Sequence, residues 1–168
     1  MGRFAGLAEV RANRGNMWFL DGNYLVRIDR TFLKSGRDGM ESFVIATEVV
    51  ESDNPSRAPG TKPSQVAKIK PQYPHLALSD FKNHVAAVLE IENPDEYHVP
   101  PEEMHPGETQ EAADDRFWNE AFELVLSDEQ PTAGMLVRLR CYTRTTEKGK
   151  PITVHQWGPV VHEVEPAA

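Results

Sequence analysis

The chain has 168 residues, 39% hydrophobic and 26% charged, and its 26 acidic and 18 basic side chains give a net charge of −8. This length and composition predict one globular domain spanning residues 1–168. No apolar run approaches the roughly 20 residues of a membrane span, and residues 1–4 lack the apolar core of a secretion signal, so we expect a cytoplasmic protein with no membrane partner. Cys141 is the single cysteine, which excludes an internal disulfide and a thiolate metal cluster.

The acidic residues are concentrated in one segment. Residues 89–129 contain 14 acidic side chains and one basic side chain, whereas the rest of the chain contains 12 acidic and 17 basic ones. The segment therefore carries a charge of −13 and the rest of the chain +5. Net acidity does not exclude a nucleic-acid partner, because the local charge of a surface decides what it attracts.

The N-terminal part is predicted to be a basic arm followed by two long strands. Residues 1–16 contain three arginines among glycine and alanine without an apolar period, which predicts a loosely ordered arm. Alternation next predicts a strand whose buried face carries Tyr24, Val26, Ile28 and Phe32. The glycines of segment 34–39 predict a hairpin, and segment 40–51, which is apolar on both faces, predicts a central strand.

A helical region is predicted between the third strand and the last hairpin. Residues 65–70 alternate and predict a short third strand, and apolar spacings of three and four predict a helix capped by Ser79. Residues 94–114 contain four prolines and seven acidic side chains, which predicts an exposed acidic, proline-rich loop insert. A second helix is predicted over residues 115–126, because its apolar residues fall along one side and its acidic start suits the helix dipole.

The hairpin predicted over residues 134–157 has one apolar face and one cationic face. Cys141 falls on the apolar face, which predicts a buried structural thiol. Gly149 supplies a residue that tolerates positive φ in the turn, and Trp157 of the second strand is expected beside the cationic face. That outward face of the first strand carries three arginines and a tyrosine: Arg138, Arg140, Tyr142 and Arg144. Such a face favours a polyanion surface, and a plain solvated sheet face is the alternative.

The order of elements predicts a mainly β fold with inserted helices. Three strands, two helices and two further strands give the connectivity of a five-stranded OB-fold barrel (β-β-β-α-α-β-β), whose open face and loops commonly hold oligonucleotides. The alternative is an α+β sandwich, in which two helices pack on one antiparallel sheet.

No motif in the sequence calls for catalysis, a metal or a cofactor. The chain has no glycine-rich phosphate loop, no serine elbow and no His-Glu-x-x-His helix, and its six histidines do not pair at ligand spacing. The dense carboxylates of residues 102–115 lie in a proline-rich segment, where solvation is the common role of such groups. We therefore expect a protein that is not an enzyme, and a metal-dependent hydrolase or nuclease stays an alternative without support from residue spacing.

The residue pattern fits binding of a single nucleic-acid strand, which needs cations along the phosphates and flat side chains under the bases. The cations expected to contact phosphates lie on the third and fourth strands and in the loop before the third: Arg138, Arg140, Arg144, Lys68, Lys70, Arg57 and Lys62. The side chains expected to stack on bases are Tyr142, Trp157 and Tyr73. The remaining large aromatic residues are assigned to the core or to helix packing: Trp18, Phe81, Phe117, Trp118 and Phe122.

A family resemblance supports this hypothesis. It is carried by four segments: GNYLVRI at 22–28, ESFVIATEVVES at 41–52, APG at 58–60 and DFKNHVAAVL at 80–89. These segments resemble small phage-encoded single-stranded DNA-binding proteins with an OB-fold. The resemblance implies a protein that coats and protects exposed single strands during DNA replication and recombination, in the host cytoplasm and without strong sequence preference.

The acidic insert is where the chain departs from that resemblance. Many bacterial single-strand binders recruit partners through an acidic tail, whereas the acidic residues here are internal. We expect the insert to recruit replication or recombination proteins or to mimic DNA, with a solubilising loop as the alternative. A second hypothesis is a protein-interaction or virion-structural module whose OB-like barrel and acidic loop dock a basic partner. The sequence leaves the oligomeric state open, with a homodimer among the options.

Overall fold

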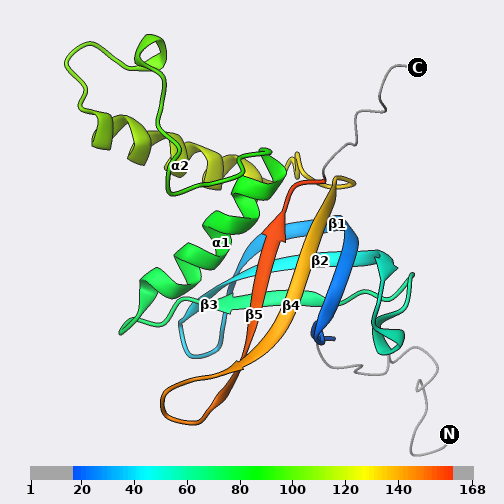
Figure 1. Cartoon of the computed structure of the whole chain (residues 1–168). Helices are drawn as coiled ribbons and strands as arrows, with labels where there is room; N and C mark the ends of the chain where they lie inside the picture. The colour runs from blue at the N-terminus through cyan, green and yellow to red at the C-terminus, as the bar shows by residue number, and fades with distance from the viewer. Residues whose placement is uncertain (1–16, 161–168) are drawn as a thin grey trace, which may run out of the picture.

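A computed structural model of the chain describes residues 17–160, so the basic arm predicted at residues 1–16 lies outside the described residues. One antiparallel sheet has the strand order β3-β2-β1-β4-β5. Its strands are β1 (Gly22–Ser35), β2 (Glu41–Ser52), β3 (Ser64–Lys68), β4 (Leu136–Thr145) and β5 (Pro151–Gly158). Helices α1 (Pro74–Val88) and α2 (Gln110–Leu126) lie between β3 and β4 in the chain, and two short 3-10 turns span Pro55–Arg57 and Pro101–Glu103. The prediction of a mainly β fold with helices inserted after the third strand is confirmed (Figure 1).

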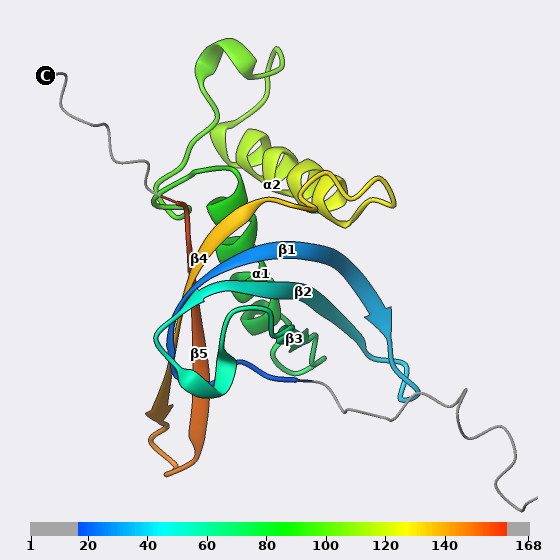
Figure 2. The ribbon, with the colours of Figure 1, turned by 90° about the vertical axis from the view of Figure 1, so that its right-hand side faces the viewer.

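The sheet is strongly curved and open between its two edge strands. β1 pairs with β2 from Tyr24 to Ser35 but with β4 only from Gly22 to Arg27, and β4 and β5 run across the other three strands (Figures 1 and 2). No ladder joins β3 to β5 within the described residues, so they form no closed barrel. As predicted, β2 is a central strand, and it lies between β1 and β3.

A bulge in β1 reverses which face its side chains occupy. The β1–β2 register shifts between Ile28 and Arg30, which leaves Asp29 as an extra residue. After the bulge Thr31 is buried and Phe32 points to the outward face, where its side chain is half-buried. The predicted placement of Phe32 on the buried face is therefore wrong, because strict alternation does not survive an inserted residue.

Gln130, in the connection from α2 to β4, holds the bent part of β1. Its side chain accepts a hydrogen bond from the Thr31 N–H at 2.8 Å and donates one to the Thr31 carbonyl at 2.8 Å. This pair of bonds stands in for a neighbouring strand just beyond the point where β4 stops pairing, because the last backbone bonds there join Ile28 to Gly134 and Met135. The amide of one side chain thus continues the ladder past the bend.

The core lies between the inner face of the sheet and α1. Phe43 of β2 stacks on Phe81 of α1 with 4.3 Å between ring centroids, and Phe122 of α2 meets Phe81 edge-on at 4.9 Å. On the inner face of β4 the buried side chains are Val137, Leu139 and Cys141. Cys141 is a buried thiol, as predicted, and burial raises its pKa to about 12.

Trp157 lies in the core, so its predicted position beside the cationic face is wrong. The register of β4 and β5 sets Trp157 opposite Leu139, which points inward, and only 8% of the tryptophan is exposed. Its indole N–H donates a 2.6 Å hydrogen bond to Oε1 of Gln65 on β3. Alternation fixed which residues of β5 share a face with Trp157, but only the register with β4 decides which face that is. The buried bond links the two open edges of the sheet.

Both helices begin earlier than predicted. α1 starts at Pro74, and Ser79 lies inside it rather than capping it, because proline suits the first turn of a helix. α2 starts at Gln110, five residues before the predicted start, and is capped by Thr109, whose hydroxyl oxygen accepts a 3.2 Å hydrogen bond from the Ala112 N–H. β3 ends at Lys68, two residues before the predicted end.

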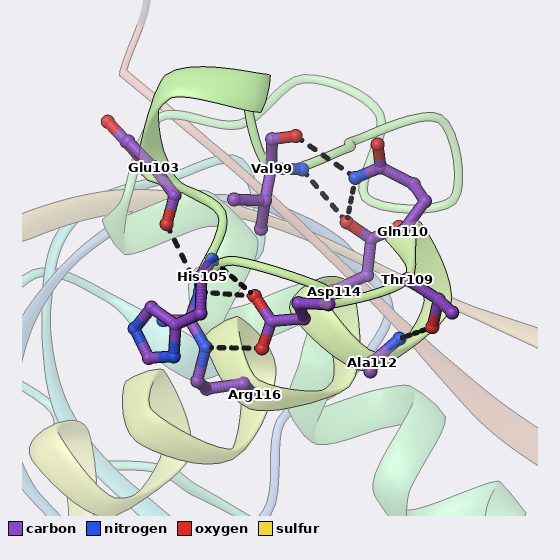
Figure 3. A network of polar contacts seen from close by, with 9 residues as sticks. Val99, Glu103, His105, Thr109, Gln110, Ala112, Asp114 and Arg116 are labelled. Carbon is purple, nitrogen blue, oxygen red and sulfur yellow. Dashed lines mark hydrogen bonds and ion pairs between the residues drawn. The ribbon is translucent and has the colours of Figure 1, made fainter.

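We define the acidic arm as residues 89–129, and its segment before α2 is tied to α2 by polar contacts rather than forming a plain loop (Figure 3). Asp114, predicted to lie in the loop, is on α2 and accepts hydrogen bonds from the Val99 N–H at 2.8 Å and from Gln110 at 2.9 Å. Its other oxygen contacts His98 Nδ1 at 2.8 Å, which together with the Val99 bond lowers the pKa of Asp114 to about 2. Most residues of the predicted loop are exposed, yet Val99 is buried.

A second contact closes the arm on itself. Arg116 of α2 donates from Nε and Nη2 to the two carboxylate oxygens of Glu108, at 3.0 and 2.9 Å, and also to the Glu103 carbonyl at 3.2 Å. The hydrogen bonds from Arg116 lower the pKa of Glu108 to about 2. The single arginine of the arm thus fixes the 3-10 turn and the start of α2 together.

Candidate nucleic-acid interface

The outward face of β4 carries the predicted cationic residues. Arg138, Arg140 and Arg144 are exposed, and Tyr142 between them is half-buried. The Arg140 guanidinium carbon lies 5.2 Å from the centroid of the Tyr142 ring, and Gln156 of β5 donates a 3.3 Å hydrogen bond to the Tyr142 hydroxyl. Among the described residues none of the three arginines forms an ion pair. Their guanidinium groups therefore keep their donors available for an anion.

The cationic face continues onto β1. The β1–β4 register places Leu25 opposite Arg138, so the next outward residue of β1 is Arg27. Beyond the bulge Arg30 takes the outward position opposite Ala46 of β2. We call the five arginines of this face the arginine track: Arg144, Arg140, Arg138, Arg27 and Arg30.

Carboxylates border the track on one side. Glu48 of β2 lies opposite Arg27, and Glu51 lies opposite Leu25, one strand away from Arg138. A phosphate chain that follows the track would therefore lie toward β4 rather than toward β2, because like charges repel.

A pocket of about 500 Å³ opens at the far end of the track, under the hairpin that joins β1 to β2. Its floor is apolar, with Phe32, Val44 and Val66 contributed by three adjacent strands. The Arg30 guanidinium carbon lies 4.7 Å from the centroid of the Phe32 ring, which ties the pocket to the track. Nothing in the sequence indicated this pocket, because Phe32 faces outward only on account of the bulge.

Two of the other predicted residues lie beside this pocket. Lys68 of β3 lines it, and its ammonium contacts the Asp38 carboxylate at 2.7 Å, which lowers the pKa of Asp38. Lys70 and Tyr73 share with Lys68 a second hollow of about 320 Å³, and the side chain of Tyr73 is 58% exposed. These residues therefore form a group of their own, separated from β4 in the sheet by β2 and β1.

The remaining predicted residues do not join the track. Arg57 is half-buried and donates to the Trp18 carbonyl at 2.6 Å and to the Ser56 carbonyl at 2.8 Å. Its guanidinium group is therefore already hydrogen-bonded to the protein backbone. Lys62 is exposed in the loop before β3, and the buried Trp157 is out of reach of a ligand. Trp18, which was predicted to lie in the core or in helix packing, is 52% exposed. Tyr142, Tyr73 and Phe32 are therefore the aromatic side chains available for stacking at these sites.

The described residues hold no group of three or more histidine, cysteine or acidic side chains that would bind a metal ion. Two histidines are shielded from solvent: His84 is buried and His155 is half-buried. His84 of α1 is fully buried, its ring centroid lies 4.7 Å from that of Trp157, and neither ring nitrogen has a hydrogen-bond partner. Burial lowers the pKa of His84 to about 3 and that of His155 to about 4, so both are neutral at physiological pH.

Between residues 17 and 160, neither helix has the length and apolar character needed to cross a membrane. A comparison of the sequence with models of protein families found no match, and a search of curated proteins found no significant match.

Proposed function

We propose that this protein binds single-stranded DNA without strong sequence preference, and so coats and protects exposed strands during replication or recombination. The observation that carries the proposal is the arginine track, which presents arginines on adjacent strands, forms no ion pair among the described residues and carries Tyr142 within it. Phosphates bind guanidinium groups whatever the base, and aromatic rings stack on any base.

The sheet order is the second support. We propose that the five strands form an OB-fold barrel that is left open between β3 and β5. The order β3-β2-β1-β4-β5 brings the first strand between the second and fourth, and the Trp157–Gln65 hydrogen bond draws the two open edges together. In OB-folds the face of the second and third strands and the neighbouring loops commonly hold oligonucleotides, and the pocket around Phe32 lies on that face.

The spacing of the track favours an extended single strand over a duplex. Outward side chains on one strand recur about every 7 Å, since each residue rises about 3.4 Å. Arg138, Arg140 and Arg144 therefore form a line of cations along the β-strand β4. They do not lie on an α-helix that could enter a groove of duplex DNA. The pocket at the end of the line has room for a base that has left the stack.

Titration of labelled oligo-dT by fluorescence anisotropy at several salt concentrations tests the proposal. Each phosphate contact contributes roughly 0.7 to the slope of log affinity against log salt for single strands, so the five arginines of the track predict a slope near −3.5. Duplex DNA of the same length should bind more weakly. If oligo-dT does not bind even at low salt, the proposal is wrong.

One observation favours the second hypothesis, a protein-interaction or virion-structural module. The acidic arm is held in one conformation by the contacts of Asp114 and Arg116, as expected of a surface that presents a shape to a partner. Absence of any binding to nucleic acid, together with a partner that is lost when residues 95–114 are deleted, would favour that module over a DNA-binding protein.

A further inference from the structure

The acidic arm and α1 enclose a groove of about 390 Å³, which we call the arm groove. Its apolar part is formed by Leu78 of α1 and by Trp118 and Phe122 of α2. Two carboxylates, Asp95 and Asp115, line it as well. An exposed apolar groove with an acidic rim fits a segment that carries both cations and an apolar side chain.

The groove already accommodates one cation. The ammonium of Lys82 lies 4.8 Å from the centroid of the Trp118 ring and 3.9 Å from a carboxylate oxygen of Asp95. Within residues 17–160 the carboxylate of Asp115 has no ion pair. The groove therefore has an aromatic face that binds an ammonium group and a second carboxylate that is free to pair with another.

A segment of this chemistry lies on the same chain, at the turn of the last hairpin. The hairpin tip, residues 144–152, contains Lys148, Lys150 and Arg144 against one carboxylate, Glu147, and therefore carries +2. Ile152 lies at its base on the outward face and is 36% exposed. Figures 1 and 2 both show this hairpin projecting from one end of the molecule and the acidic arm from the opposite end.

We propose that the hairpin tip of one copy docks in the arm groove of a second copy. The hairpin tip projects away from α2, which contributes Trp118 and Phe122 to the groove, so the contact forms between molecules, with Ile152 against the apolar part and Lys148 and Lys150 at Asp95 and Asp115. The contact joins different patches on the two copies, so it repeats head to tail and builds rings or open chains. It is argued from the hairpin tip and the groove rather than from the proposed DNA binding, with which it shares only Arg144, because Arg138 and Arg140 lie outside the tip.

Charge exchange tests the proposal by sedimentation velocity. Wild-type protein at low salt should sediment faster as its concentration rises, and should return to the monomer at high salt. The tip variant K148E/K150E and the groove variant D95K/D115K should each be monomeric, because each sets like charges against one another. An equimolar mixture should assemble again, since each altered surface now faces its complement on the other variant.

Several results would overturn the proposal. A wild-type protein that stays monomeric at high concentration and low salt would overturn it, and would leave the groove to a basic segment of another protein. Either variant assembling alone like the wild type, or a mixture that remains monomeric, would also overturn it. I152S gives an independent check: it keeps both lysines, and assembly that is no weaker than in the wild type contradicts docking of Ile152 on the apolar floor.

Discussion

Replacing Trp157 by phenylalanine should weaken the closure between the two edges of the sheet. The change removes the indole N–H that donates to Gln65. The amide oxygen of Gln65, a residue that is only 3% exposed, then has no hydrogen-bond partner. An orphaned buried polar group costs about 1–3 kcal/mol, and the smaller ring adds about 1 kcal/mol for lost packing. We therefore expect the free energy of unfolding to fall by about 2–4 kcal/mol in a urea titration.

A double-mutant cycle separates the hydrogen bond from the packing. Q65L removes the acceptor, and in the W157F/Q65L double variant no unpaired amide remains, so the double loss should be smaller than the sum of the single losses by about 1 kcal/mol or more. Y142F is the matched control, because it deletes an exposed polar contact between β4 and β5 and should cost less than about 0.5 kcal/mol. Additive single losses, or a W157F cost no larger than that of Y142F, would contradict a stabilising hydrogen bond between Trp157 and Gln65.

Three further predictions concern acid stability, the bend of β1 and the pocket. His84 has a folded-state pKa of about 3 and titrates near 6.5 when unfolded, so its contribution to stability is fully present above pH 6.5 and is lost as the pH falls toward 3; the total loss is about 3–5 kcal/mol. Urea midpoints between pH 6.5 and 5 check this, because Glu108 and Asp114 titrate lower and only the lowered pKa of a second histidine, His155, at about 4, adds a decline in this range. H84M should therefore make the decline about half as steep, and an equal decline in H84M would assign it to other groups. Q130A should destabilise the fold by about 1–3 kcal/mol, since it leaves the Thr31 N–H and carbonyl without those partners, and should speed hydrogen exchange at Thr31; unchanged exchange would contradict the role given to Gln130. F32S should weaken oligo-dT binding by about 1–3 kcal/mol through the lost stacking surface, while L33S, at the next residue and on the other face, should not; equal effects of the two would count against the pocket.

The sequence predicted the elements that follow a regular period. β4 alternates without interruption, so its buried and outward residues could be assigned before the structure, including Arg138, Arg140 and Cys141. β2 was recognised as central because it is apolar on both faces. In these strands the pattern of burial is set by local alternation alone, which a single sequence contains.

What the sequence did not predict depends on contacts distant in the chain. The bulge at Asp29 turns Phe32 outward, and the bent strand after it is held by Gln130, which lies 99 residues from its partner Thr31. The face of Trp157 follows from the β4–β5 register and from Gln65, 92 residues away. Such pairings are not visible in a short stretch of sequence. They decide the faces of Phe32 and Trp157, the two residues whose observed positions changed the candidate site.

The early start of α2 was missed for a different reason. Residues 94–114 have the composition of a solvated loop, yet Thr109 supplies a helix cap and Asp114 and Arg116 bind the preceding segment back onto the helix. The cap was present in the sequence as a threonine just before an alanine-containing run, and it is the signal that would have placed the helix correctly.

The role of the arginine track in DNA binding is tested by the salt dependence of oligo-dT binding by the R138A/R140A variant. Removing two cations from the arginine track should reduce the magnitude of the slope of log affinity against log salt by about 1.4, and should weaken binding at low salt. K82A, which removes a cation on α1, is the control and should leave the slope unchanged. An R138A/R140A variant that binds with the affinity and the slope of the parent protein would contradict the proposed role of the track.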